Sequence, residues 1–172
     1  MRVLVTVASR HGSTREIGVE VAEVLRAAGH DVVEADPDEV EAVDGYDAVV
    51  LGSAVYVGRL AAALRELVDR QGAQLAARPT WLFWSGRVGE PPLPAAEPDD
   101  VRVVARRVAA RDVAAFGGRL QRDELGLAER ALVAMIEAEA GDFRDFDEVD
   151  AWAARVADEL RRMERGGRVA QG

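Results

Sequence analysis

A short run of hydroxyl-bearing and small residues follows the first apolar stretch of the chain. Ser9, Ser13 and Thr14 lie within six residues that also hold Gly12. Serine and threonine hydroxyls donate hydrogen bonds to anions, and glycine allows a tight turn and a close approach of the backbone. An amphipathic stretch begins directly after them, so the unpaired N–H groups at the start of a helix would face the same point. These residues predict a phosphate-binding loop.

The same residues have a second interpretation. Ser13 and Glu16 have the spacing of a capping box, in which the two side chains satisfy backbone N–H groups of an ordinary helix start. Local chemistry alone leaves both interpretations open. The density of hydroxyls in six residues favours the phosphate loop.

The residue types that the chain lacks exclude most side-chain chemistry. It has no Cys and no Lys. The first absence excludes disulfides, iron–sulfur clusters and cysteine nucleophiles, and the second excludes a Walker A loop and a pyridoxal Schiff base. His11 and His30 are too few for a histidine-rich metal centre, and we expect His30, in a helix-to-strand turn, to be exposed. Any catalysis is therefore expected to depend on a cofactor.

The charge of the chain limits its partners. The formal net charge is −9, which repels nucleic acid and anionic membrane surfaces but admits a basic protein partner. No apolar run approaches the roughly 20 residues of a membrane span. The first residues lack the basic region and apolar core of a signal peptide. We therefore expect a cytoplasmic protein with no transmembrane segment and no nucleic-acid partner.

Apolar stretches and helical spacing alternate along the chain. Strands are predicted over residues 2–8, 31–35, 46–51, 80–84 and 113–116. Helical patterns cover residues 17–28, 37–43, 60–75, 101–111 and 125–139, the last of these apolar around much of its circumference and expected to be largely buried. A final helix is expected after a capping box at Asp145 and Glu148, with an inner stripe of Val149, Trp152, Val156 and Leu160.

This alternation is typical of a parallel α/β sheet with right-handed crossovers. Ligands of such sheets bind beyond the carboxyl ends of the strands, where the strand order reverses. The segments to examine are therefore residues 9–14, 52–59 and 85–90, after the first, third and fourth strands. We expect one domain over residues 1–163, followed by a flexible tail over residues 164–172.

The first of these segments resembles the flavodoxin phosphate signature, [ST]-x-T-G-x-T. Ser9, Gly12 and Thr14 stand at matching positions, and His11, which also donates hydrogen bonds, replaces the usual Thr. The resemblance implies an α/β, flavodoxin-like fold with a five-stranded parallel sheet in the order 2-1-3-4-5 and helices on both faces. It also implies FMN as the cofactor, with the phosphate held by Ser9, Arg10, His11, Gly12, Ser13 and Thr14.

The resemblance places the flavin ring at the other two segments. Tyr56 would cover a ring face, since aromatic stacking adds roughly 1 kcal/mol beyond area burial, and Arg87 would add positive charge near the ring. The alternatives are a surface tyrosine and a solvated arginine in a flexible loop. The residues implied to contact the ring are Ala54, Val55, Tyr56, Val57 and Gly58 in one segment, and Ser85, Gly86, Arg87, Val88 and Gly89 in the other.

Three further stretches narrow the resemblance. GSAVYVGRL at residues 52–60, FGGRL at 116–120 and GDFRDFDEVDAWA at 141–153 are similar to the flavodoxin-like group that includes menaquinone-dependent protoporphyrinogen oxidase. That group implies an FMN oxidoreductase that passes electrons from a protoporphyrinogen-like donor to a quinone, with the chemistry on FMN and no catalytic side chain.

Two other functions remain open at the level of sequence. The first is a single-electron carrier between protein partners, which the acidic charge suits. The second is an interaction domain without flavin, which the intact first loop argues against. Flavodoxin-like enzymes often dimerise, so a homodimer is also possible.

Overall fold

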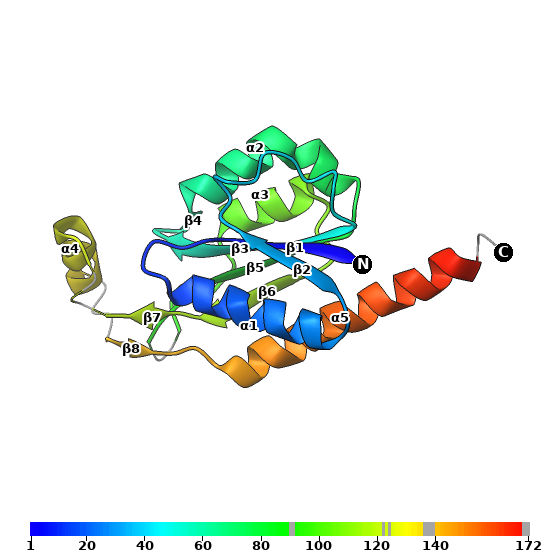
Figure 1. Cartoon of the computed structure of the whole chain (residues 1–172). Helices are drawn as coiled ribbons and strands as arrows, with labels where there is room; N and C mark the ends of the chain where they lie inside the picture. The colour runs from blue at the N-terminus through cyan, green and yellow to red at the C-terminus, as the bar shows by residue number, and fades with distance from the viewer. Residues whose placement is uncertain (90–91, 122, 124, 136–139, 170–172) are drawn as a thin grey trace.

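A parallel sheet forms the centre of the molecule (Figure 1). The computed structural model describes residues 1–89, 92–121, 123, 125–135 and 140–169. The parallel strands lie in the order β2-β1-β3-β5-β6, and the two-residue β4 pairs antiparallel with β3. Leaving out β4, this is the predicted order 2-1-3-4-5. The sheet strands are β1 (Arg2–Ala8), β2 (Asp31–Ala35), β3 (Ala48–Tyr56), β4 (Arg59–Leu60), β5 (Thr80–Arg87) and β6 (Val113–Gly117).

Helices cover both faces of this sheet, as predicted (Figure 1). One face packs against α1 (Ser13–Ala27) and α5 (Phe146–Val169), the other against α2 (Ala62–Ala76) and α3 (Asp99–Arg107). The alternation of side chains along β1 shows why its sequence is nearly continuously apolar: Val3, Val5 and Val7 enter the first layer, whereas Leu4 and Ala8 enter the second. A strand that is buried on both faces is mostly apolar, and Thr6 is the one buried polar residue of β1.

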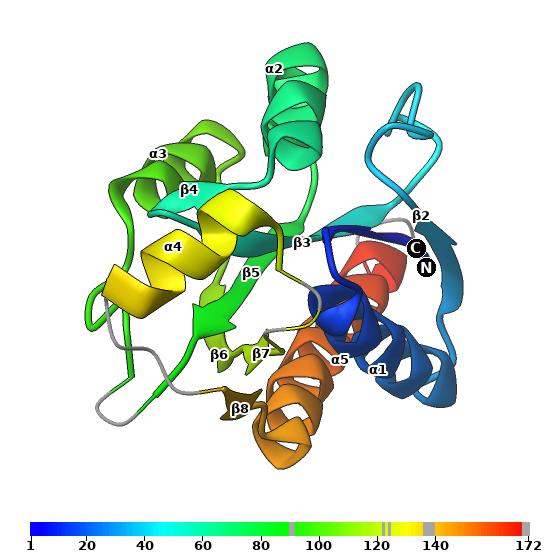
Figure 2. The ribbon, with the colours of Figure 1, turned by 90° about the vertical axis from the view of Figure 1, so that its left-hand side faces the viewer.

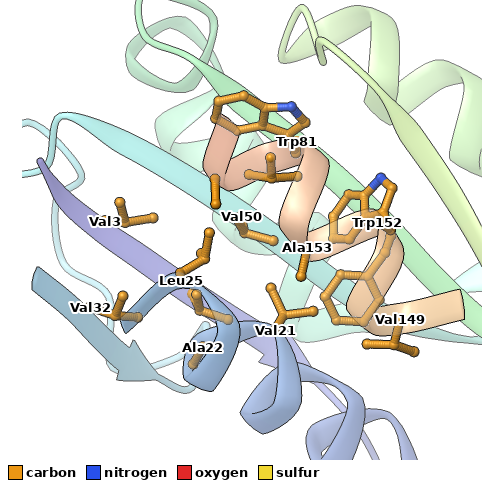
Figure 3. Packing of buried hydrophobic residues seen from close by; sticks show 14 of the residues in the cluster. Val3, Val21, Ala22, Leu25, Val32, Val50, Trp81, Val149, Trp152 and Ala153 are labelled. Atoms are coloured by element: carbon orange, nitrogen blue, oxygen red, sulfur yellow. The ribbon is translucent and has the colours of Figure 1, made fainter. Parts of the chain in front are cut away.

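An aromatic cluster anchors α5 to the sheet (Figure 3). Trp152 packs against Phe83 of β5 and Phe116 of β6, and the ring centroids lie 5.8 Å apart in each pair. The indole N–H also donates to Asp112 Oδ2 at 2.9 Å. The predicted inner stripe of this helix is confirmed, since Val149, Trp152, Val156 and Leu160 are all buried. One half of the predicted capping box is present, because Asp145 Oδ1 accepts from the N–H groups of residues 147 and 148.

An excursion of the chain between β6 and α5 differs from the prediction. Its short strands β7 (Arg119–Leu120) and β8 (Gly141–Asp142) pair antiparallel, and α4 (Leu127–Met135) lies between them in sequence. Figure 1 shows α4 projecting beyond the carboxyl edge of the sheet, and Figure 2 looks onto that edge with α4 in front. Leu127 is 88% exposed and Met135 79%. The prediction of a largely buried helix was therefore wrong for the described residues, because the excursion holds α4 away from the core.

Other predicted elements shift or disappear. Residues 37–43 form turns instead of a brief helix. The carbonyls that a helix would use internally accept hydrogen bonds from arginine side chains instead, with Arg70 donating to Pro37 O at 3.2 Å and Arg78 donating to Val43 O. Helix α3 begins at Asp99 and ends at Arg107, earlier at both ends than predicted.

Helix α5 continues to Val169, so the described part of the predicted tail 164–172 is helical. Among the described residues, no helix combines the length and the apolar character needed to cross a membrane.

His30 is buried, which corrects the prediction of an exposed histidine. Its side chain is 1% exposed and lies close to Glu164 of α5, with Nδ1 4.0 Å from Oε1. Glu164 of α5 covers the turn in which His30 stands. Burial lowers the pKa of His30, and the N-terminal ammonium lowers it further.

This burial predicts a loss of stability in mild acid. The unfolded chain takes up a proton at His30 near pH 6.5, whereas the folded chain resists it to lower pH. The free energy of unfolding should therefore decrease as the pH falls below about 6.5. We expect His30→Leu to lose less stability than the wild type between pH 7.5 and pH 5.5, measured by urea unfolding with tryptophan fluorescence. Equal losses in the two proteins would contradict this role.

Candidate functional site

The segment between β1 and α1 forms a tight turn with open space beside it. Gly12 is the N-cap residue of α1, with a φ of +82°, in the left-handed region that glycine adopts without strain. Its N–H donates to Ser9 Oγ at 3.0 Å, which closes the turn. A Cβ at Gly12 would meet no atom within 4 Å. The turn therefore leaves open space at the start of the helix.

No side chain caps α1 within the described structure. Glu16, which would complete the capping box with Ser13, instead accepts hydrogen bonds from Arg144 at 2.6 Å and Arg119 at 3.2 Å. The capping-box interpretation was therefore wrong. The N–H groups of the first turn keep their capacity to bind an anion, at the positive end of the helix dipole.

Tyr56 brings the end of β3 against this turn. Its phenol oxygen accepts a hydrogen bond from the N–H of Arg10 at 3.3 Å, and the Arg10 guanidinium lies 5.1 Å from the ring centroid. The ring also contacts His11 edge-on, with centroids 6.2 Å apart. Tyr56 is thus half-buried against the first loop and not a free surface tyrosine. A cavity of about 400 Å³ borders Ser9, Arg10 and Tyr56.

The second predicted segment is strand over most of its length. Residues 52–56 belong to β3, and only Val57 and Gly58 form the turn into β4. Both have positive φ, +51° and +72°, as in the two-residue hairpin turns that match the twist of the strands. Ala54 and Val55 are buried, whereas Val57 is 77% exposed. The expectation of a loop from residue 52 was wrong because β4 pairs with β3 and extends it.

The third predicted segment also starts inside a strand. Ser85, Gly86 and Arg87 end β5, beyond the predicted limit at residue 84. Gly86 has a φ of +135°, and a Cβ there would lie 2.8 Å from the Val55 carbonyl oxygen. Only glycine therefore allows β5 to pass so close to β3. Val88 then pairs with Leu93, and Gly89, with a φ of +83°, lies between them.

The structure brings the three predicted segments together at one edge of the sheet (Figure 2). Tyr56 joins the first segment to the second through Arg10. Thr14 Oγ1 lies 2.7 Å from Ser85 Oγ, which joins the first segment to the third. Val55 and Gly86 join the second to the third by close backbone approach. The three predicted segments therefore contact one another at this edge.

Sequence reasoning missed an ionic network that is centred on Arg144 and contacts the start of α1. Arg144, whose side chain is 5% exposed, donates to both carboxylate oxygens of Asp142 at 2.8 and 2.7 Å, to Glu16 and to the Ser13 carbonyl. Hydrogen bonds from Arg144 lower the pKa of Glu16 and of Asp142. No sequence signal could reveal this network, because its members lie up to 131 residues apart.

Removing this guanidinium should loosen the start of α1. We expect Arg144→Gln to lower the free energy of unfolding by about 1–3 kcal/mol, since charged hydrogen bonds at a mostly buried side chain are lost. Because the pKa values of Glu16 and Asp142 are lowered, this contribution is present above their unfolded values and is lost as the pH falls through the folded ones. The difference from the wild type should therefore shrink from pH 6 to pH 3.

The matched control for this variant is Arg161→Gln. Arg161 pairs with Asp158 three residues away at an exposed position, and such pairs contribute little, so we expect a change within about 0.5 kcal/mol. Urea unfolding of both variants measures the contrast. Equal losses in the free energy of unfolding would mean that the Arg144 network does not stabilise the start of α1.

Comparison with known proteins agrees with this geometry. The model of the flavodoxin domain family matches residues 4–147. An archaeal flavodoxin structure aligns with a TM-score of 0.65 at 13% identity, over 94% of this chain and 99% of that one. Flavodoxin 1 from Bacillus cereus aligns with a TM-score of 0.61 at 15% identity, over 90% and 95%.

A larger protein shares the same fold in part of its length. Rubredoxin oxygen:oxidoreductase from Desulfovibrio gigas aligns with a TM-score of 0.62 at 12% identity, over 93% of this chain and 36% of that one. A comparison with curated proteins gives no match. At these identities the solved structures show a shared fold, and the family model shows the relationship. The chain belongs to the flavodoxin domain family.

Proposed function

We propose that this chain binds FMN and carries electrons between protein partners. The observation that carries the proposal is the start of α1, where Gly12 replaces a side-chain cap and leaves the first-turn N–H groups beside open space. A phosphate satisfies those groups and the helix dipole together. When bound, FMN supplies redox chemistry that the side chains of this chain lack.

The residues present fit the phosphate group. Backbone N–H groups and the hydroxyls of Ser9, Ser13 and Thr14 are donors, and Arg10 is a cation on the same loop. A cavity of about 400 Å³ adjoins this loop at Ser9 and Arg10, and Asp36, Asp38 and the start of α2 line its other side. We assign phosphate binding to the six residues of the first segment, Ser9, Arg10, His11, Gly12, Ser13 and Thr14.

The other two segments would hold the ring. Tyr56 is positioned by Arg10 and His11 and presents an aromatic face. Gly86 brings its backbone close to β3 without a side chain in the way. Residues 54–58 and 85–89 would thus orient the ring and limit the access of water to it.

The charge of the chain supports the carrier function. A net charge of −9 favours docking of a basic redox protein, because complementary charges raise the rate of encounter. The proposal includes a cytoplasmic location, where such partners and FMN occur together.

A specific observation favours a second candidate. Helix α4 exposes Leu127 and Met135 beyond the edge at which the three segments meet. An apolar electron donor or acceptor could contact these exposed side chains, whereas docking of a protein partner does not require them. This arrangement fits an FMN oxidoreductase that acts on a protoporphyrinogen-like donor and a quinone.

Anaerobic reduction with dithionite separates the two candidates. If the protein is a carrier, the FMN-loaded wild type should take up electrons in two separate one-electron steps. The visible absorbance of the flavin monitors these steps. A single two-electron step, together with oxidation of protoporphyrinogen when a quinone is added, would replace the carrier with the oxidoreductase. Free FMN under the same conditions is the control.

A further inference from the structure

Two buried hydroxyls lie against each other where the first and third segments of the site meet. Thr14 Oγ1 and Ser85 Oγ are 2.7 Å apart, and the two residues are 1% and 2% exposed. Thr14 stands in the first turn of α1, and Ser85 stands near the end of β5. The pair therefore joins the segment proposed for the phosphate to a segment proposed for the ring.

A count of hydrogens shows that this pair is incomplete. Each hydroxyl has one hydrogen to donate, so the pair has two, and the bond between the oxygens uses one. Among the described residues, neither hydroxyl makes a hydrogen bond to another group. Buried polar groups in proteins are nearly always satisfied. Within the described residues no acceptor takes the second hydrogen, so it is available to a ligand.

The direction of the bond decides what a ligand meets. If Thr14 donates to Ser85, Thr14 offers only lone pairs to the ligand, and these repel an anion. If Ser85 donates to Thr14, the hydrogen of Thr14 remains for a phosphate oxygen, and such charge-assisted bonds are the stronger kind.

We propose that Ser85 is a positioning residue for phosphate recognition: it donates to Thr14 and thereby directs the Thr14 hydroxyl to the phosphate of FMN. This inference rests on the proposed function. It assigns the Ser85 side chain to the phosphate end of the cofactor, although its backbone lies in the segment proposed for the ring.

A purely structural link between α1 and β5 makes a different prediction. Such a link would hold the two elements together and would affect the binding of FMN and of riboflavin equally. Riboflavin has the same ring and ribityl chain but no phosphate, so it is the matched probe. A positioning role affects FMN alone.

The experiment compares both flavins in four proteins: the wild type, Ser85→Ala, Thr14→Val and the double variant. Thr14→Val removes the donor itself and should weaken FMN roughly 10- to 100-fold, the range for a hydrogen bond to a charged group. Ser85→Ala leaves Thr14 able to donate but no longer directed, and should weaken FMN about 3- to 10-fold. Riboflavin affinity should change less than about twofold in each variant.

The double variant tests whether Ser85 acts through Thr14. Its FMN affinity should equal that of Thr14→Val within about twofold, because a positioning residue has nothing to direct once the donor is gone. Ser85→Cys, which keeps the size of the side chain and a weak donor, should lie between the wild type and Ser85→Ala. Ser85→Cys also replaces Ser85→Ala in this test if the alanine variant does not fold.

The outcomes are distinguishable. A wild type that binds neither flavin overturns the proposed function and this inference with it. A wild type that binds FMN while Ser85→Ala weakens both flavins equally overturns the inference alone, and so does a double variant whose losses are additive.

Discussion

Gly12→Asp should abolish most FMN binding while leaving the fold intact. Asp tolerates the left-handed backbone region better than most residues, and a negative charge at a helix N-terminus favours the helix. The same charge would stand at the proposed phosphate position. Two charges about 4–7 Å apart near a protein surface repel by about 2–4 kcal/mol, so FMN affinity should fall roughly 30- to 700-fold. Fluorescence titration with FMN measures the loss.

The control for this result is Gly12→Asn, which has almost the same shape and the same tolerance of positive φ. It should keep most of the FMN affinity, and both variants should unfold within about 1 kcal/mol of the wild type. Riboflavin, which has no phosphate, should bind the Asp and Asn variants with equal affinity. If FMN does not distinguish them either, its phosphate does not bind at the start of α1.

Trp152→Ala should produce the largest loss of stability. The side chain is 1% exposed and packs on two phenylalanine rings that come from β5 and β6. Its removal leaves a cavity between α5 and the sheet, and such truncations of large aromatic residues cost about 3–5 kcal/mol. Urea unfolding followed by circular dichroism measures the loss without relying on this tryptophan as the probe.

Trp152→Phe separates packing from hydrogen bonding. It keeps an aromatic ring in the cluster and removes the N–H that donates to Asp112. Asp112 is exposed and can bond water instead, so the loss should be about 1–2 kcal/mol, well below that of the alanine variant. Equal losses would mean that the hydrogen bond, and not the aromatic packing, anchors α5.

The sequence predicted the parallel sheet well because its strands are buried on both faces. A strand such as β1 is recognisable because Val3, Leu4 and Val5 are all apolar. The stripe on α5 was predictable for a related reason, since Trp152 and Val156 repeat at helical spacing. The place of the first loop followed from the rule that parallel strands gather their carboxyl ends at one edge.

The errors have a common cause in contacts between distant residues. His30 is buried by α5, whose last turns pack over a turn more than 120 residues earlier in the sequence. Residues 125–139 look like a core helix because they are apolar, but the pairing of β7 and β8 carries α4 away from the core. Apolar composition indicates that a helix packs against something, but it does not identify the surface against which the helix packs.

The candidate site divides in the same way. The sequence located the first loop, but it began the second and third loops too early, inside β3 and β5, and it did not predict the bonds between the segments. Nothing local indicates that Glu16 binds Arg144 instead of capping α1, or that Thr14 meets Ser85. These contacts decide which N–H and O–H groups remain for a ligand, and only the three-dimensional structure reveals them.

The most direct test of the central claim is a titration of the wild-type chain with FMN, followed by the quenching of flavin fluorescence, with riboflavin in parallel. The account predicts saturable quenching at one FMN per chain and a clearly weaker interaction with riboflavin, because the first loop binds the phosphate. Absence of quenching, or equal affinity for the two flavins, would contradict a phosphate site at the start of α1.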